Sequence, residues 1–115
     1  MSASVNGQLD SVSLLLEKGA KVNAVDNSGL TALMQACAGC NADIVAKLIR
    51  AGADANAIDK SGRTALMYAA FKGDVESCKV LLANGAKRDV VDSTGKTALI
   101  HATEQQKPNV ISLLQ

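Results

Sequence analysis

Cys37 and Cys40 stand in the C-x-x-C spacing, which serves thiol redox chemistry or supplies half of a zinc site. Zinc takes four ligands, and only Cys78 and His101 remain as candidate partners. A redox pair needs a thiol whose pKa is lowered by a nearby cation, and no basic residue flanks this pair. We therefore predict that both cysteines are structural, as small apolar side chains, and that the chain holds no metal.

Other chemical signals are weaker. Gly95-Lys96-Thr97 is similar to the end of a phosphate-binding loop, but the full motif requires glycine where the chain has Val90. His101 is the only histidine, so a hydrolytic triad or a histidine metal cluster lacks its parts. Most carboxylates fall at turns and helix starts, where they complement backbone amides. We predict no enzymatic activity and no cofactor.

The bulk composition excludes several classes of protein. The 115 residues suffice for one domain, 1–115, and 12 basic against 11 acidic residues argue against nucleic acid as a partner. No apolar run approaches the roughly 20 residues needed to span a membrane, and the first residues lack the pattern of a secretory signal. Three cysteines, an odd number, indicate a reducing compartment. The expected location is the cytoplasm, with the nucleus as the alternative.

These residues belong to elements that recur every 33 residues. Asp26, Asp59 and Asp92 each open the phrase Asp-x-x-Gly-x-Thr-Ala-Leu, and Gly-Ala pairs beginning at 19, 52 and 85 keep the same spacing. A unit of this length cannot bury its apolar side alone. The period therefore predicts a stack in which each unit covers its neighbour and leaves an outer face free for binding.

The unit 59–91 is the clearest copy. It opens on a turn in which Gly62 supplies a positive φ. Thr64 is placed to cap a helix over 65–72, and a second helix with an apolar stripe is expected over 75–83. The expected units are 1–25 (partial), 26–58, 59–91 and 92–115 (partial). The remaining helices are expected over 9–17, 32–39 and 42–50, and from Ala98 and Pro108 onward.

The pattern Asp-x-x-Gly-x-Thr-x-Leu, then Ala-Ala-x-x-Gly, then Leu-Leu-x-x-Gly-Ala resembles the ankyrin repeat over essentially the whole chain. The resemblance implies an all-α solenoid of helix-turn-helix units joined by β-hairpin loops. In size the chain is similar to small free-standing four-repeat ankyrin proteins of the myotrophin type. A fragment of a longer ankyrin domain is the alternative.

The chain departs from the family at one motif. The usual Thr-Pro-Leu-His is replaced by Thr-Ala-Leu-Met at 31–34 and 64–67, and by Thr-Ala-Leu-Ile at 97–100. Alanine favours a helix but does not fix φ as proline does. Methionine or isoleucine in place of histidine removes a polar contact between the cap and the neighbouring loop. We expect a somewhat less stable stack with the same fold.

In ankyrin proteins, partners usually dock on the hairpin tips and the outward side of each first helix. The resemblance therefore implies a non-catalytic protein–protein interaction module, expected to be a monomer. The alternative is a structural scaffold segment of a larger protein that contacts its own neighbouring domains. The predicted partner-binding residues are Leu30, Gln35, Lys60, Arg63, Tyr68, Phe71, Lys72, Lys96 and His101.

Tyr68 and Phe71, the only tyrosine and the only phenylalanine, both fall in this set. Aromatic side chains are common interface anchors, although Phe71 could instead pack locally on the next repeat. The set contains four basic residues, and the one acidic residue expected on the same surface is Glu104. This balance predicts a protein partner with an acidic surface and an apolar centre. The alternative is an ordinary solvated face.

Two further positions keep the period. Asn23 and Asn56 lie in the loops after the second helices, where the family uses asparagine to connect one loop to the next. Val25, Ile58 and Val91 precede the turns. They could form an apolar line along the hairpins, but β-branched residues are also favoured in extended chain, which is the reading we prefer.

Overall fold

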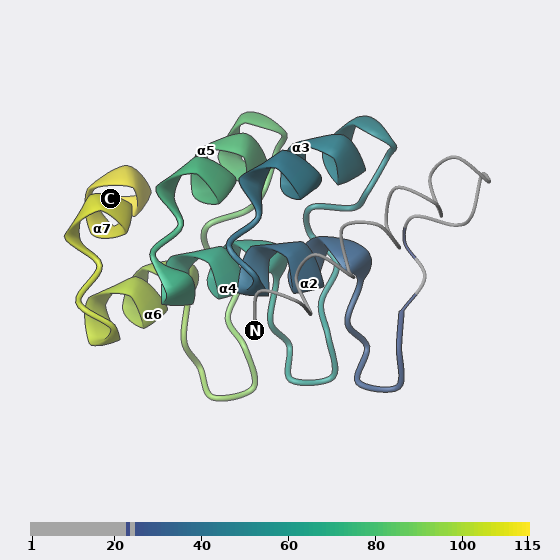
Figure 1. Cartoon of the computed structure of the whole chain (residues 1–115). Helices are drawn as coiled ribbons and strands as arrows, with labels where there is room; N and C mark the ends of the chain where they lie inside the picture. The colour runs from purple at the N-terminus through teal and green to yellow at the C-terminus, as the bar shows by residue number, and fades with distance from the viewer. Residues whose placement is uncertain (1–22, 24) are drawn as a thin grey trace.

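The computed structural model describes Asn23 and residues 25–115 (Figure 1). The described helices are α2 (Ala32–Ala38), α3 (Ala42–Arg50), α4 (Ala65–Lys72), α5 (Val75–Ala83), α6 (Ala98–Glu104) and α7 (Pro108–Leu114). Each begins at the predicted residue, and the predicted ends of those given a range differ by at most one residue. The helix expected over 9–17 lies outside the described residues.

The helices form two rows. The first helices α2, α4 and α6 pack side by side, the second helices α3, α5 and α7 form the other row, and each first helix contacts the second helix that follows it. Three hairpin loops extend from the first-helix row, away from the second (Figure 1). In the described part of the chain, strand pairing is limited to one antiparallel bridge between Val25 and Thr31. The structure is therefore the all-α stack that the resemblance implied.

The first helices start where the repeated threonine caps them. The Oγ1 atom of Thr64 accepts a hydrogen bond from the amide of Met67 at 3.3 Å, and Thr31 and Thr97 make the same bond in their own units. A cap of this kind typically contributes about 1 kcal/mol. Three caps in phase set the register of the whole first-helix row.

The residues that replace the family's histidine are buried by the next repeat. Met34 and Met67 are 1% and 2% exposed, whereas Ile100, at the same position of the last unit, is 39% exposed. The difference arises because α4 covers α2 and α6 covers α4, while α6 has no first helix after it in this chain. The apolar substitution thus serves packing between repeats.

The loops after the second helices are joined as predicted. The Asn56 side chain donates from Nδ2 to the carbonyl of Gly85 at 3.1 Å and accepts the amide of Lys87 on Oδ1 at 2.8 Å. Asn23 makes the equivalent two bonds one repeat earlier, at 3.2 and 2.7 Å. Each asparagine satisfies backbone groups of the following repeat and so connects successive units.

Successive hairpins are also in direct contact. The amide of Lys60 donates to the carbonyl of Ser28 at 3.1 Å, and the amide of Ser93 donates to that of Ser61 at 2.9 Å. Gly62 has φ +74°, and a Cβ there would lie 3.2 Å from the Ser93 nitrogen. Glycine is needed at this position both for its conformation and for the close approach of the next hairpin.

Candidate partner-binding surface

Each hairpin aspartate is hydrogen-bonded to the residue nine positions later, on the first helix of its own unit. The side-chain Nε2 of Gln35 donates to Asp26 Oδ2 at 3.4 Å, and the Tyr68 hydroxyl donates to Asp59. In the last unit, Asp92 Oδ2 and His101 Nε2 are 2.8 Å apart. An aspartate in a turn would otherwise bond only to local backbone. Here it also positions a side chain of the predicted surface. We refer to these three bonds as the hairpin–helix links.

Asp92 is the most heavily bonded of the three aspartates. Its Oδ1 accepts from the amides of Thr94 at 2.9 Å and Lys96 at 3.0 Å, and from the Thr94 hydroxyl at 2.6 Å. Burial opposes ionisation of Asp92, but these bonds and the one from His101 outweigh it and hold the pKa of Asp92 below its usual range. An ionised carboxylate can only accept, so the proton in the link lies on His101 Nε2.

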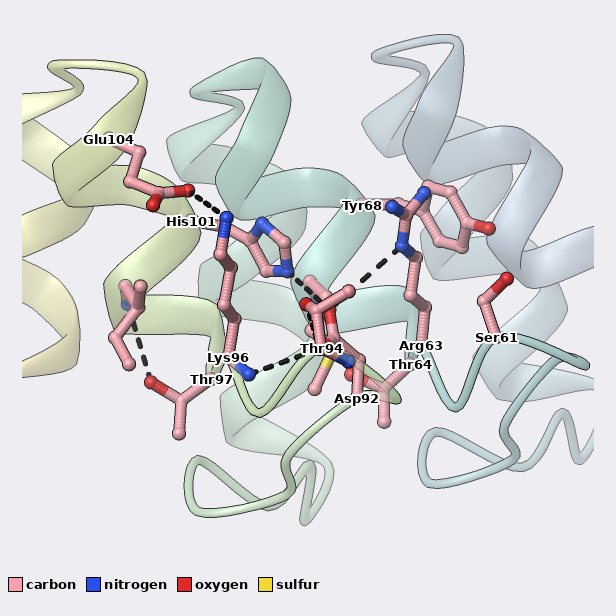
Figure 2. Close-up of polar contacts among 12 residues, drawn as sticks. Ser61, Arg63, Thr64, Tyr68, Asp92, Thr94, Lys96, Thr97, His101 and Glu104 are labelled. Carbon is pink, nitrogen blue, oxygen red and sulfur yellow. Dashed lines mark hydrogen bonds and ion pairs between the residues drawn. The ribbon is translucent and has the colours of Figure 1, made fainter.

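Arg63 connects the hairpin of unit 59–91 to that of unit 92–115 (Figure 2). Its Nε lies 4.0 Å from Asp92 Oδ2, and its Cζ lies 6.0 Å from the centroid of the Tyr68 ring. Lys96 Nζ pairs with Glu104 Oε1 at 2.9 Å. Two of the four predicted basic residues therefore have an acidic neighbour. Lys60 and Lys72 are exposed and take no part in the ion pairs of the described residues.

A cavity of about 170 Å³ opens on the first-helix row. It is lined by Ala38, Arg63, Met67, Tyr68, Phe71, Lys72 and His101. The Phe71 ring meets the His101 ring edge to face, with centroids 6.3 Å apart, yet the residue remains 43% exposed. Phe71 therefore packs on the next repeat, as the local interpretation expected, and its exposed part also lines the cavity; its role as a partner anchor stays a prediction.

The structure brings five of the nine predicted residues to this cavity. His101 is largely buried and contributes the wall of the cavity rather than an exposed side chain. The other four predicted residues do not line it: Leu30 and Gln35 are partly buried, Lys60 is exposed on its hairpin, and Lys96 is half-buried beside Glu104.

Sequence reasoning missed part of the site. The sequence marks the methionine at position 67 only as a departure from the family pattern, but its side chain lines the cavity. The turn pattern predicts Asp59 and Asp92 as turn residues but does not indicate that they also position Tyr68 and His101. The nine-residue spacing from each aspartate to a hydrogen-bond donor was the available signal.

The residues before the turns, Val25, Ile58 and Val91, are each more than half exposed. They do not pack into the core of the described residues. Their exposure leaves three apolar side chains spaced along the hairpins, one in each of three successive units.

The cysteines show no sign of thiolate activation. Burial raises the pKa of the Cys37 thiol, and it raises the pKa of the Cys78 thiol to about 12. The pKa of the Cys40 thiol is also raised, mainly by burial and to a smaller extent by the nearby charge of Asp74. A reactive thiol needs the opposite shift. Cys37 is fully buried, and Cys40 adopts φ +56°, close to the +74° of Gly73 one repeat later. Among the described residues, no three His, Cys, Asp or Glu side chains are grouped to hold a metal ion.

Comparison with known families identifies the class of protein. Ankyrin repeats, in three copies, match the chain over residues 1–92 and 33–115, so the chain belongs to the ankyrin repeat family. A comparison with curated proteins found no match. Ankyrin repeats are generally protein–protein interaction modules, and the family is typically non-enzymatic. None of the described helices has the length and apolar character to cross a membrane.

Proposed function

We propose that this chain is a non-catalytic protein-binding module whose partner docks on the hairpins and first helices. The observation that carries the proposal is the cavity on the first-helix row, which gathers residues of α2, α4 and α6 and has the half-exposed Phe71 in its wall. A concave, mostly apolar site with a few polar groups is the usual form of a binding site.

The charges on this face favour an acidic partner. Asp59 and Asp92 are buried, and their carboxylate oxygens accept hydrogen bonds from within the chain. Glu104 is paired with Lys96. Lys60 and Lys72 are exposed and take no part in the ion pairs of the described residues. The exposed charges nearest the cavity, on Arg63 and Lys72, are therefore positive, and this local excess speeds encounter with an acidic surface and makes association sensitive to salt.

Capture of the natural partner by matched double variants tests the binding face. Tyr68→Ala with Phe71→Ala should reduce recovery about tenfold or more, because truncation of aromatic anchors weakens interfaces strongly. Glu76→Ala with Lys79→Ala, an exposed pair on α5, should leave recovery unchanged. Circular dichroism of both variants checks the fold. Loss of the partner only with the α5 pair would place the interface on the second-helix row instead.

Kinetics of the captured complex test the charge argument. Lys72→Glu should slow association more than Lys96→Glu, because Lys96 is already paired with Glu104. Tyr68→Ala should act mainly on the dissociation rate. Equal effects of the two lysine reversals on association would contradict the assignment of the free positive charge to Lys72.

One observation favours the alternative of a structural segment that contacts neighbouring domains of a larger protein. Ile100 exposes an apolar side chain at the position that is buried in both preceding units. A neighbouring element packed against α6 would cover it. Ile100→Lys separates the two functions, because it should leave partner capture by the first-helix face intact and should abolish a contact that covers α6.

A further inference from the structure

We propose that the cavity binds one bulky apolar side chain of an acidic peptide segment, with a carboxylate of that segment held between Arg63 and Lys72. This inference rests on the proposed protein-binding function and specifies what part of the partner is recognised.

The size and lining of the cavity select a single apolar side chain. Apolar cavities of about 150 Å³ accommodate a group the size of benzene, and this one measures about 170 Å³. Met67 is nearly inaccessible, Ala38 and the Phe71 ring form apolar walls, and the His101 ring, hydrogen-bonded to Asp92, forms a further wall. A leucine, methionine or phenylalanine side chain fits such a space, whereas a whole helix does not.

The walls are held in place before a ligand arrives. Tyr68 is bonded to Asp59 and His101 to Asp92, and Arg63 lies between the Tyr68 ring and the Asp92 carboxylate. Side chains fixed in this way lose little conformational entropy on binding, so less of the interaction energy is spent on ordering them.

The positive charge at the rim of the cavity is only partly balanced. The Arg63 side chain is 44% exposed, and its nearest acid, Asp92, is at 4.0 Å, beyond direct hydrogen-bond distance. Lys72 makes none of the ion pairs found among the described residues. The terminal guanidinium N–H groups and the Lys72 ammonium can therefore take a carboxylate, and charge-assisted bonds to arginine are the stronger kind. In a peptide, that carboxylate comes from Asp or Glu.

Titration of the ¹⁵N-labelled full chain with three blocked synthetic peptides tests the proposal. The first is acetyl-Gly-Glu-Glu-Leu-Glu-Glu-Gly-amide, the second has Ala in place of Leu, and the third has Lys in place of every Glu. We expect saturable shifts at the amides of Ala38, Phe71, Lys72 and His101 with the first peptide. The alanine peptide should bind about tenfold more weakly or worse, and the lysine peptide should cause no such shifts.

Two matched variants of the chain complete the experiment. Lys72→Glu should weaken binding of the leucine peptide about tenfold or more, and Lys79→Glu, on α5, should leave it unchanged. Both positions are exposed, so neither substitution threatens the fold.

Several results would overturn the proposal. The leucine and alanine peptides could bind equally, the lysine peptide could shift the same amides, or the leucine peptide could cause no saturable shift. Each of these leaves the protein-binding function standing if the Tyr68 and Phe71 variant still loses the natural partner. Shifts confined to α3, α5 and α7 would contradict both the cavity and the proposed face.

Discussion

The two edges of the stack use polar contacts in different ways. At the edge formed by the loops after the second helices, Asn23 and Asn56 bond to backbone groups of the next repeat. At the hairpin edge, the aspartates of the hairpin–helix links also bond to side chains that differ from unit to unit. A contact with backbone holds the units together whatever their sequence, while a contact with a side chain lets the surface vary without altering the fold.

The hairpin edge is itself uneven. The link of Asp26 is exposed and long at 3.4 Å, whereas that of Asp92 is buried and short at 2.8 Å. A hydrogen bond to a charged group gains strength where water is excluded, and loss of the partner then costs more. The links should therefore contribute very differently to stability despite their identical spacing.

The largest effect is expected when the Asp92 link is removed. Asp92→Ala leaves His101 and the hairpin amides of Thr94 and Lys96 without their acceptor. We expect a loss of about 3 kcal/mol in the free energy of unfolding, measured by urea denaturation. Asp26→Ala is the matched control and should cost about 1 kcal/mol, since water replaces its exposed contacts. Equal losses would remove the distinction between the two links.

The second-largest loss of stability is expected at the edge formed by the loops after the second helices. Asn56→Ala deletes the bonds to Gly85 and Lys87 and should lower the free energy of unfolding by about 2 kcal/mol. Asp89 occupies the same position one unit later, is exposed, and makes no side-chain hydrogen bond among the described residues. Asp89→Ala should therefore change stability by less than about 0.5 kcal/mol. A comparable loss in both variants would show that the asparagine bonds do not connect the repeats.

Acid should weaken the hairpin edge more than the loop edge. The pKa of Asp92 in the folded chain lies below its ordinary value of 3.8. Its contribution is therefore fully present above the unfolded pKa and is lost as pH falls through the folded pKa. We expect the free energy of unfolding to decrease as the pH is lowered beneath about 4. In Asp92→Asn this decrease should be smaller. Urea denaturation at a series of pH values measures both. An unchanged slope in Asp92→Asn would assign acid sensitivity to other carboxylates.

The smallest change in stability is expected between the two edges, at the turn that connects the first helix of a unit to its second helix. Cys40 holds φ +56°, a conformation that costs a non-glycine residue about 1 kcal/mol. Cys40→Gly should therefore stabilise the chain by up to about 1 kcal/mol, while Cys40→Ala should not. Gly73→Ala should have the opposite effect, because φ +74° strains a non-glycine residue and the added Cβ would also displace the Lys107 side chain, whose Cδ lies at 2.7 Å. Thermal unfolding followed by circular dichroism resolves these changes, and destabilisation by Cys40→Gly would count against the strain.

Most of the fold follows from the sequence because the repeat supplies the same local signals in phase. The threonine caps, the apolar stripes and Pro108 placed the described helices to within a residue wherever a boundary was predicted. The hairpins were less accessible to this reasoning. Each hairpin is closed by its own bonds, such as that from the Asp92 amide to the Lys96 carbonyl at 3.0 Å, but the contacts between successive hairpins, such as the bond from Ser93 to Ser61, have no local signal.

The candidate site was only partly predictable. The family resemblance and the residue types together pointed to Tyr68 and Phe71, and the structure places both at the cavity. Charge counting treated the basic residues as equivalent, yet Lys96 is paired with Glu104 eight residues later while Lys72 is not paired in the described part of the chain. The burial of His101 was also missed, because it depends on Asp92 and on packing against Phe71. Such pairings are set by side-chain geometry rather than by composition.

The hairpin–helix links have a consequence for how such a chain can diversify. Each link closes within nine residues, so a duplicated unit inherits both the anchoring carboxylate and the helix position that it orients. A substitution there needs only to retain a hydrogen-bond donor, and amide, phenol and imidazole already occupy the three copies. New surface chemistry can thus be sampled one repeat at a time while neighbouring units keep their register.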